Sequence, residues 1–332
     1  MVEKTSTFKE KRDKVSGAKK VGLALGSGAA RGLAHIGVLK VLDREGIPID
    51  FVAGTSAGAL IGALYAAGIS PFEIEEITLN IDKRKTISLF TPTISNSGLL
   101  DGSRIEKFIE SILGKQNIGT LKIPFAAVAT DLQRGEEIII TEGSLLTAIR
   151  ASMSIPGIFT PVEYNGRLLV DGGLVNPVPV STTIGMGADI VIAVNVLPPP
   201  QKNIQNLIIK KEPRTTKIGK INSKVVNTRM GKYLASLKPI AYAKKLVKKK
   251  TLGPNIFSMI LQSIAITNYQ IAALQLTRYK PDFLITPEVE FIRPHEFFRG
   301  EEAISAGEKA ALAVLPEIKD RLENPVKPSG GE

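Results

Sequence analysis

Two short apolar segments of this chain run directly into glycines and then into residues with helical spacing. Residues 19–28, "KKVGLALGSG", read as a strand that ends in glycines, and residues 32–46, "GLAHIGVLKVLDREG", place apolar side chains three and four positions apart. The same order returns in "IDFVAG" at 49–54 and in the small-residue helix "SAGALIGALYAAG" at 56–68. Strands that alternate with helices in this way predict an α/β fold, with a mostly parallel central sheet and helices on both faces.

Further segments continue the alternation. Helices are expected at 71–81, 102–114 and about 301–322, with a Thr/Ser/Asn-rich loop around residues 86–98. Additional strands are expected at "IPFAAVAT" (123–130), "EEIIIT" (136–141), "ADIVIAVNVL" (188–197) and "DFLITPEV" (282–289), and "VEYNGRLLV" (162–170) reads as a hairpin that turns at Asn165-Gly166.

The domain prediction is a single α/β unit over residues 19–322, because a chain with 43% hydrophobic residues can bury a sizeable core. The charged N-terminus at 1–18 is expected to be flexible, and the tail at 323–332 is expected to be disordered. Three consecutive prolines, Pro198 to Pro200, end one strand and open a basic segment at about 198–250. We interpret that segment as a cap or insertion.

Composition excludes several kinds of site and segment. The chain has no cysteine, which excludes disulfides, thiolate metal sites and cysteine nucleophiles. Its N-terminus lacks the apolar run of about 7–15 residues that a signal peptide needs. No uninterrupted apolar span reaches the roughly 18 residues of a transmembrane helix. The expectation is a cytoplasmic protein.

The net charge of +11 comes from one part of the chain. Residues 201–250 contain 15 Lys or Arg residues and one acidic residue, whereas the rest has 28 basic and 31 acidic residues. Apolar side chains recur there at three- and four-residue steps, which is typical of an amphipathic helix at an anionic membrane surface. No nucleic-acid-binding motif accompanies the charge, so no nucleic acid is expected, and a solvated charge run is the alternative. The lysines proposed for membrane contact are Lys244, Lys245, Lys248, Lys249 and Lys250.

Ser56 is the candidate nucleophile. It is the central residue of "GTSAG", a G-x-S-x-G pattern with Gly54 and Gly58 on either side. An apolar strand directly before and a helix directly after are the context in which this pattern presents a reactive serine. The alternative is a serine that only caps the helix.

The first glycine cluster, "GSGAARG" at 26–32, also lies between a strand and a helix, so its backbone amides can converge on an anion. A dinucleotide-binding turn is the rival interpretation, but Arg31 stands where that fingerprint needs its third glycine, and Gly32 comes one position late. Arg31 itself can form a salt bridge that stabilises the loop or can contact substrate. The candidate oxyanion donors are the amides of Gly26, Ser27, Gly28, Ala29 and Ala57.

Asp171 is the candidate partner of the serine. It follows the apolar "LLV" and precedes Gly172 and Gly173, which allow the backbone to turn sharply at the end of the strand. Sites of α/β sheets gather at the carboxyl ends of strands. The alternative is an ordinary Asp-Gly turn.

The ordered motifs "GSGAARG", "GTSAG" and "DGG" resemble the patatin-like phospholipases, and "ASMSIPGIFTPV" at 151–162 resembles a further stretch of bacterial members. The resemblance covers roughly residues 20–197 and, weakly, 282–322. The chain departs at Ser27, where plant members have a glycine; an amide donor remains there. The resemblance implies a three-layer patatin-like fold and a serine–aspartate dyad of Ser56 and Asp171. It further implies hydrolysis of phospholipid or lysophospholipid acyl esters without metal or organic cofactor. The basic segment, in a protein expected to be cytoplasmic, predicts peripheral contact with the inner membrane face.

Two alternatives to the dyad remain open. The chain has only two histidines, His35 and His295. His35 shares an apolar helix side with Leu39 and is expected in the core or behind the site. His295 follows the last strand, and would give the Ser–Asp–His order of a soluble carboxylesterase or thioesterase. The other alternative is a module that binds a lipid or nucleotide without turnover.

Overall fold

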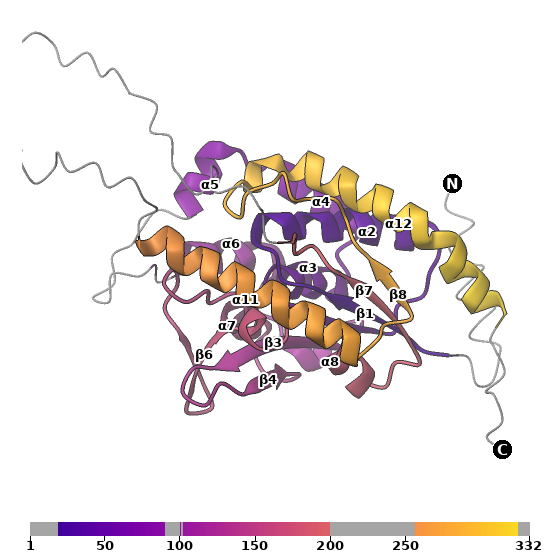
Figure 1. Ribbon diagram of the computed structural model, residues 1–332. Coiled ribbons are helices and arrows are strands. Elements are labelled where there is room, and N and C mark those ends of the chain that lie inside the picture. The colour runs from indigo at the N-terminus through magenta and orange to yellow at the C-terminus, as the bar shows by residue number, and fades with distance from the viewer. Residues whose placement is uncertain (1–18, 90–99, 101, 200–255, 325–332) are drawn as a thin grey trace, which may run out of the picture. The chain divides into compact units, whose positions relative to one another are not determined.

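The computed structural model describes residues 19–89, 100, 102–199 and 256–324 (Figure 1). The chain divides into two compact units, residues 1–200 with 263–332, and residues 201–262. The first unit carries the sheet. The predicted flexible N-terminus at 1–18 lies outside the described residues, as do all but the first two residues of the predicted basic cap (about 198–250) and of the predicted disordered tail (323–332).

An eight-stranded sheet forms the centre of the first unit, in the order β5-β6-β3-β2-β1-β7-β8, with β4 also paired to β3. Neighbours from β3 through β2, β1 and β7 to β8 are parallel, whereas β4 and β6 are antiparallel to β3, as β5 is to β6. The predicted mostly parallel sheet is therefore confirmed. The strands are β1 (Val21–Leu25), β2 (Phe51–Thr55), β3 (Phe125–Asp131), β4 (Glu137–Ile140), β5 (Val162–Tyr164), β6 (Arg167–Asp171), β7 (Ile190–Val194) and β8 (Phe283–Ile285).

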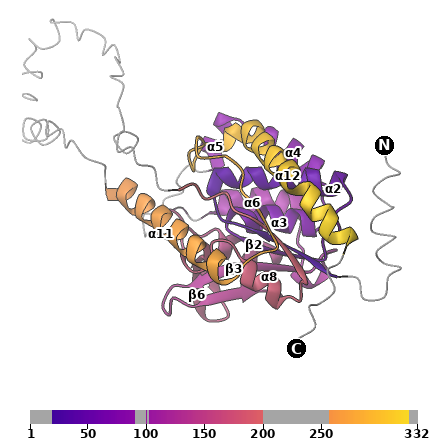
Figure 2. The same ribbon diagram turned by 45° about the vertical axis from the view of Figure 1, so that its right-hand side comes forward.

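Helices cover both faces of the sheet (Figures 1 and 2). The α-helices are α2 (Ala34–Arg44), α3 (Ala57–Ala66), α4 (Pro71–Leu79), α5 (Lys83–Leu89), α6 (Ser103–Leu113), α7 (Leu145–Ser152), α8 (Val180–Gly185), α11 (Ile256–Arg278) and α12 (Gly300–Glu323). Short 3-10 turns are η1 (Ala29–Leu33), η2 (Ile118–Thr120), η3 (Gly172–Leu174) and η5 (Phe297–Arg299).

The strands divide their side chains between two cores, because successive residues of a strand point to opposite faces. Leu23 and Ile192 face the larger core, together with residues of α2, α3, α7 and α12. Ala24 and Ala193 face a smaller core that includes Ala272 of α11. Figure 1 shows α11 and α8 on one side of the strands and α2, α4 and α12 on the other. This arrangement confirms the three-layer prediction.

One edge of β3 brings two strand ends together. β4 pairs with β3 across residues 127–130, so β2 and β6 share the opposite edge. β2 ends there with Thr55 opposite Val128, and β6 ends with Asp171 opposite Ala129. The residues that follow β2 and close β6 are thus neighbours in space although they lie far apart in sequence.

Several helices were not predicted. The expected loop around 86–98 begins inside α5, which Asp82 initiates by accepting a hydrogen bond from the Lys85 amide (2.7 Å). α7, α8 and α11 were also missed. In α11 the apolar and polar residues are spread around the helix rather than separated into two faces, so its sequence lacks the periodicity that indicates a helix.

Gly37 of α2 and Gly307 of α12 let these helices touch backbone to backbone. A Cβ on Gly37 would lie 2.0 Å from the Ile304 carbonyl oxygen, and a Cβ on Gly307 would lie 2.0 Å from the Ala34 carbonyl oxygen. No side chain fits at either position without separating the helices.

We expect Gly37→Ala to lower the free energy of unfolding by about 1–3 kcal/mol, the usual cost of overpacking. Gly185→Ala in α8 is the matched control, since no atom among the described residues lies within 4 Å of its added Cβ. Urea unfolding of both variants measures the difference. Equal unfolding midpoints would contradict the packing argument.

Candidate active site

Ser56 lies at the junction of β2 and α3, and only 4% of it is exposed. Its backbone has φ 54° and ψ −117°, a conformation that residues other than glycine rarely adopt. Such strain persists only where the surroundings enforce it, and it is common at functional sites. The strand-to-helix elbow predicted for G-x-S-x-G is therefore present around Ser56.

Asp171 closes β6 and accepts a hydrogen bond from the Ser56 hydroxyl, with 2.5 Å between Oγ and Oδ2. The other carboxylate oxygen accepts from the Gly173 amide at 2.7 Å. Burial raises the pKa of Asp171 to about 6, and the hydrogen bonds from Ser56 and Gly173 act in the opposite direction. The carboxylate is thus a better proton acceptor than an exposed aspartate, and it already holds the serine proton at hydrogen-bond distance.

Two serines near the end of α7 hold both members of this pair. The Ser152 hydroxyl accepts from the Ser56 amide at 2.8 Å and donates to the Val128 carbonyl at 2.6 Å. The Ser154 carbonyl accepts from the Asp171 amide at 2.9 Å. Sequence analysis assigned no role to either serine, although both lie in the segment that carried the resemblance to bacterial patatin-like proteins.

The two glycine-containing turns meet directly. A Cβ on Gly32 would lie 2.4 Å from the Cβ of Ala57, the residue after Ser56. A Cβ on Gly58 would lie 2.1 Å from the Leu25 carbonyl oxygen, and one on Gly54 would lie 2.4 Å from the Gly58 carbonyl oxygen. These glycines are needed for close approach, which brings the turn after β1 against the first turn of α3.

The amides of Gly26 and Ser27 are already occupied. Gly26 donates to the Val194 carbonyl at 3.0 Å, and Ser27 donates to the Pro177 carbonyl at 2.8 Å. The prediction that these two amides are oxyanion donors is corrected, because each would have to break a buried backbone hydrogen bond. Their bonds instead attach the glycine turn to the rest of the sheet.

The amides of Gly28, Ala29 and Ala57 remain as candidate donors. None of the three has a hydrogen-bond acceptor among the described residues. Ala29 has φ 50°, the second strained residue of the site, and opens η1. An oxyanion or a phosphate oxygen readily accepts hydrogen bonds from free backbone amides at the start of a helical turn.

Arg31 is half-buried in η1, and its Nε has no hydrogen-bond partner within the described part of the chain. Burial lowers the pKa of its guanidinium, whereas the charges of Glu290 and Glu296 raise it. The residue therefore lies in the field of two carboxylates, which fits its expected role of stabilising the loop.

The histidines take different positions. His35 is fully buried in α2, as expected, and its Nε2 lies 2.7 Å from the Gly26 carbonyl oxygen. His295 is exposed, in a loop that reaches η1 through a hydrogen bond from the Ala30 amide to the Pro294 carbonyl (3.1 Å). Among the described residues, no hydrogen bond joins either histidine to Ser56. In the described part of the chain, the Ser56 hydroxyl donates to Asp171.

α11 lies over the turn that follows Asp171. With its amide nitrogen turned toward that turn, Asn268 donates to the Gly173 carbonyl at 2.9 Å, and Gln275 donates to the Val175 carbonyl at 3.0 Å. Both helix residues belong to the same compact unit as the sheet. An element that the sequence did not reveal thus supports the catalytic loop from the side of the smaller core.

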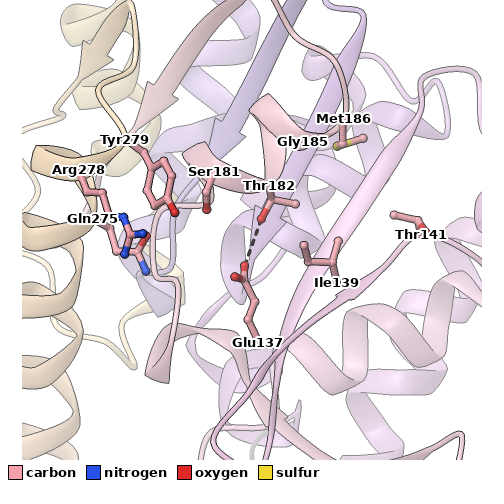
Figure 3. A pocket seen from close by; sticks show the side chains of 10 residues that line it. All are labelled: Glu137, Ile139, Thr141, Ser181, Thr182, Gly185, Met186, Gln275, Arg278 and Tyr279. Atoms are coloured by element: carbon pink, nitrogen blue, oxygen red, sulfur yellow. Dashed lines mark hydrogen bonds between the residues drawn. The ribbon is translucent and has the colours of Figure 1, made fainter.

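A hollow of about 340 Å³ lies beside β4, α8 and the end of α11, away from Ser56 and Asp171 (Figure 3). Its central carboxylate, Glu137, accepts from Thr182 Oγ1 at 3.2 Å and from the buried Asn176 side chain at 2.8 Å. The Asn176 carbonyl in turn accepts from Thr55, the residue before Ser56. Through Glu137 and Asn176, residues around the hollow therefore help to hold the loop next to Ser56 in place.

Known proteins are similar in sequence to this part of the chain. Residues 23–184 match the family model of the patatin-like phospholipases. This part of the chain is a patatin-like phospholipase domain. It contains Ser56, Asp171 and both glycine turns, which were assigned to that family from their motifs.

Relatives of the domain include an uncharacterised NTE family protein of Mycobacterium bovis, 42% identical over 54% of this chain and 50% of that protein. Neuropathy target esterase sws of Drosophila melanogaster is 36% identical over 53% of this chain and 13% of its own length. Patatin-like phospholipase domain-containing protein 7 of Rattus norvegicus is 32% identical over 72% and 19%. The chain thus spans half or less of the length of each of these relatives.

We expect Ser152→Ala to lower both the stability of the patatin-like domain and its kcat. The variant leaves the buried Ser56 amide without an acceptor, which costs about 1–3 kcal/mol of stability. It also releases the strained elbow, so kcat should fall as well. Urea unfolding and ester hydrolysis measure the two effects.

Ser111→Ala is the matched control, since Ser111 lies on α6 and its hydroxyl donates only to a carbonyl of its own helix. Its effect on stability should stay within about 0.5 kcal/mol. Wild-type activity in Ser152→Ala would show that the elbow does not depend on this serine.

Proposed function

We propose that the protein is a serine lipid acyl hydrolase that cleaves acyl esters of phospholipids or lysophospholipids through a Ser56–Asp171 dyad. The observation that carries the proposal is the 2.5 Å hydrogen bond from the Ser56 hydroxyl to the buried Asp171 carboxylate, inside a patatin-like domain. A hydroxyl needs an adjacent base before it can attack an ester, and this carboxylate is in position.

The first half-reaction forms an acyl-enzyme. Asp171 takes the Ser56 proton as Oγ attacks the ester carbonyl carbon, and the carbonyl oxygen becomes an oxyanion. The free amides of Gly28, Ala29 and Ala57 donate to that oxyanion, which is the stabilisation that matters most in acyl transfer. The intermediate collapses when the C–O bond to the alcohol breaks, and the alcohol leaves with the proton that Asp171 held.

The second half-reaction regenerates the enzyme. Asp171 takes a proton from water, whose oxygen attacks the acyl carbon, and the same amides hold the new oxyanion. Ser56 then leaves with the proton from Asp171, and the fatty acid is released. A carboxylate whose pKa is raised to about 6 suits both directions, because it accepts a proton more readily than an exposed aspartate and still returns it.

α11 supports a lipid as the substrate. Its 22 residues from Ile256 to Thr277 include no charged side chain, although surface helices normally carry charge on their outer face. Ile266 is 41% exposed and Leu274 is 71% exposed, on the helix whose inner side contacts the turn after Asp171. Exposed apolar side chains on an uncharged helix beside the dyad favour substrate that arrives from a lipid surface.

The membrane proposal is peripheral contact. Within the described residues, no helix combines the length and apolarity needed to cross a bilayer. The basic residues 201–250 directly precede α11 in sequence, and their charge favours an anionic surface. We therefore propose that the enzyme acts at the inner membrane face, where an electrostatic anchor would raise the local concentration of lipid substrate.

The competing functions differ in what they require. A Ser–Asp–His triad using His295 would need the loop after β8 to bring that exposed side chain to Ser56. A module that binds a lipid or nucleotide without turnover would need no hydrogen-bonded nucleophile. The experiments below separate these functions from the dyad.

Ser56→Ala should abolish ester hydrolysis and labelling by a fluorophosphonate probe, because the attacking oxygen is removed. Wild type should be labelled at Ser56, which mass spectrometry of the labelled peptide identifies. Circular dichroism should be unchanged in the variant. Labelling of a different serine in folded wild type, or no labelling and no hydrolysis at all, would refute the assignment.

Asp171→Asn should lower kcat by a factor of about 10⁴, the scale of loss when the base system of a serine hydrolase is disabled. His295→Ala should stay within about threefold of wild type, since an exposed side chain without contact to Ser56 contributes little. Steady-state kinetics on a short-chain nitrophenyl ester measure both. A loss in folded His295→Ala as large as that in Asp171→Asn would replace the dyad by the triad.

The pH dependence of kcat/KM should follow Asp171. The base must be deprotonated to take the serine proton, so activity is present above the raised pKa and falls as the pH drops through about 6. A rate profile between pH 4.5 and 8.5 tests this at about half-unit steps. An acid limb near the ordinary aspartate value of about 4 would mean that burial does not tune this carboxylate.

Reversing the charge of five lysines tests the membrane proposal; they lie outside the described residues. The variant should bind anionic vesicles more weakly but hydrolyse a soluble ester at the wild-type rate, because its changes lie far in sequence from the dyad. High salt should mimic the variant, since the Debye length shrinks from about 10 Å at 0.1 M to about 3 Å at 1 M. Equal, salt-insensitive co-sedimentation of both proteins would contradict the proposal. The substitutions are to Glu at Lys244, Lys245, Lys248, Lys249 and Lys250.

A further inference from the structure

His35 is a fully buried polar residue that the proposed reaction does not use. Its Nε2 lies 2.7 Å from the Gly26 carbonyl oxygen, and because a carbonyl only accepts, Nε2 carries the proton. The other ring nitrogen, Nδ1, is buried and has no hydrogen-bond partner among the described residues. The side chain therefore makes one polar contact, and that contact is to the turn after β1.

The peptide that joins Gly26 to Ser27 is held at both ends. His35 donates to its carbonyl oxygen, and its N–H, which belongs to Ser27, donates to the Pro177 carbonyl at 2.8 Å. The preceding amide, of Gly26, donates to the Val194 carbonyl at 3.0 Å. A peptide plane with partners on both sides cannot rotate without breaking two buried hydrogen bonds.

The next amides along the turn, those of Gly28 and Ala29, have no acceptor among the described residues and are two of the three candidate donors. Gly28 has φ 175° and ψ 2°, and Ala29 is held at φ 50°. The Gly28 N–H lies in the peptide plane directly after the Gly26–Ser27 plane, and the Ala29 N–H lies in the next one, so the directions of both depend on how the Gly26–Ser27 plane is held. Without the hydrogen bond from His35 to the Gly26 carbonyl, the Gly26–Ser27 peptide plane could rotate. The Gly28 and Ala29 amides would then no longer point at the acyl oxygen.

We propose that His35 is a positioning residue for the oxyanion turn: by holding the Gly26 carbonyl it keeps the Gly28 and Ala29 amides directed at the acyl oxygen. This role rests on the proposed acyl hydrolysis. His35 acts through the backbone and touches neither substrate nor the dyad.

The chemistry of the residue favours this role over simple packing. A buried acceptor without a partner, here Nδ1, destabilises the folded state, and an apolar residue of similar volume would avoid that cost. Burial lowers the pKa of His35 to about 4, against the Gly26 carbonyl, which raises it. The ring is therefore neutral at neutral pH, with its single proton placed on Nε2 for the carbonyl. A histidine here costs stability and supplies one permanent donor.

The test compares His35→Leu with His35→Gln. Leucine fills the site but donates nothing, whereas the glutamine side chain can place an N–H near the position of Nε2. Leu39→Met is the matched control, since Leu39 is equally buried on the same helix and belongs to the large core. Three quantities are measured for each protein: kcat and KM on a soluble nitrophenyl ester, the urea midpoint, and amide hydrogen exchange of peptides covering residues 22–34.

We expect His35→Leu to unfold at the wild-type urea concentration or higher and to lose about 10- to 100-fold in kcat with KM little changed, since removal of one oxyanion donor costs about 10²–10³. His35→Gln should recover most of kcat. Exchange in the turn should be about tenfold faster in His35→Leu than in wild type or Leu39→Met, because the protected Ser27 amide opens with its peptide.

Wild-type kcat in folded His35→Leu would overturn the proposal. So would a loss of kcat in both His35→Leu and His35→Gln that is proportional to their loss of stability. An inactive, unlabelled wild type would instead refute the acyl hydrolase function. In that event hydrogen exchange still tests whether His35 holds the turn. Unchanged exchange in His35→Leu would refute that role, and faster exchange would establish that the hydrogen bond from His35 stabilises the turn.

Discussion

The site depends on two strands that share one edge of β3. β2 ends opposite Val128 and β6 ends opposite Ala129, so the residue after β2 and the last residue of β6 meet. Ser152 hydrogen-bonds both the Val128 carbonyl and the Ser56 amide, which ties the elbow to the same strand. Because the sheet backbone sets these positions, Ser56 and Asp171 lie 2.5 Å apart without any rearrangement of a loop.

The arrangement puts unfavourable features together and stabilises each through its neighbours. Asp171 is a buried carboxylate with a raised pKa, Ser56 and Ala29 have positive φ, and the Nδ1 atom of His35 has no partner in the described structure. Each would lower stability on its own, and they gather where the turns after β1, β2 and β6 meet. Such clustering is expected where a fold gives up stability to hold reactive groups ready.

Sequence reasoning failed where local pattern and tertiary contact diverge. α11 went unrecognised because its apolar residues are spread around the helix, yet its Asn268 contacts the turn after Asp171. Gly26 and Ser27 were taken as oxyanion donors because a glycine-rich turn exposes its amides in principle. Their acceptors, carbonyls of residues 194 and 177, come from distant parts of the chain, and no local rule names them.

By itself the sequence determined the alternation of strands and helices, the mostly parallel sheet, and the identity of Ser56 and Asp171 as candidates, because periodicity and strand–glycine–helix motifs are local properties. Only the tertiary structure decided which atoms meet. It placed Asp171 beside Ser56, left the amides of Gly28, Ala29 and Ala57 without an acceptor in the described structure, and set His35 against the Gly26 carbonyl. Hydrogen-bond partners, burial and the resulting pKa arise from segments brought together by folding, and spacing along the chain does not encode them.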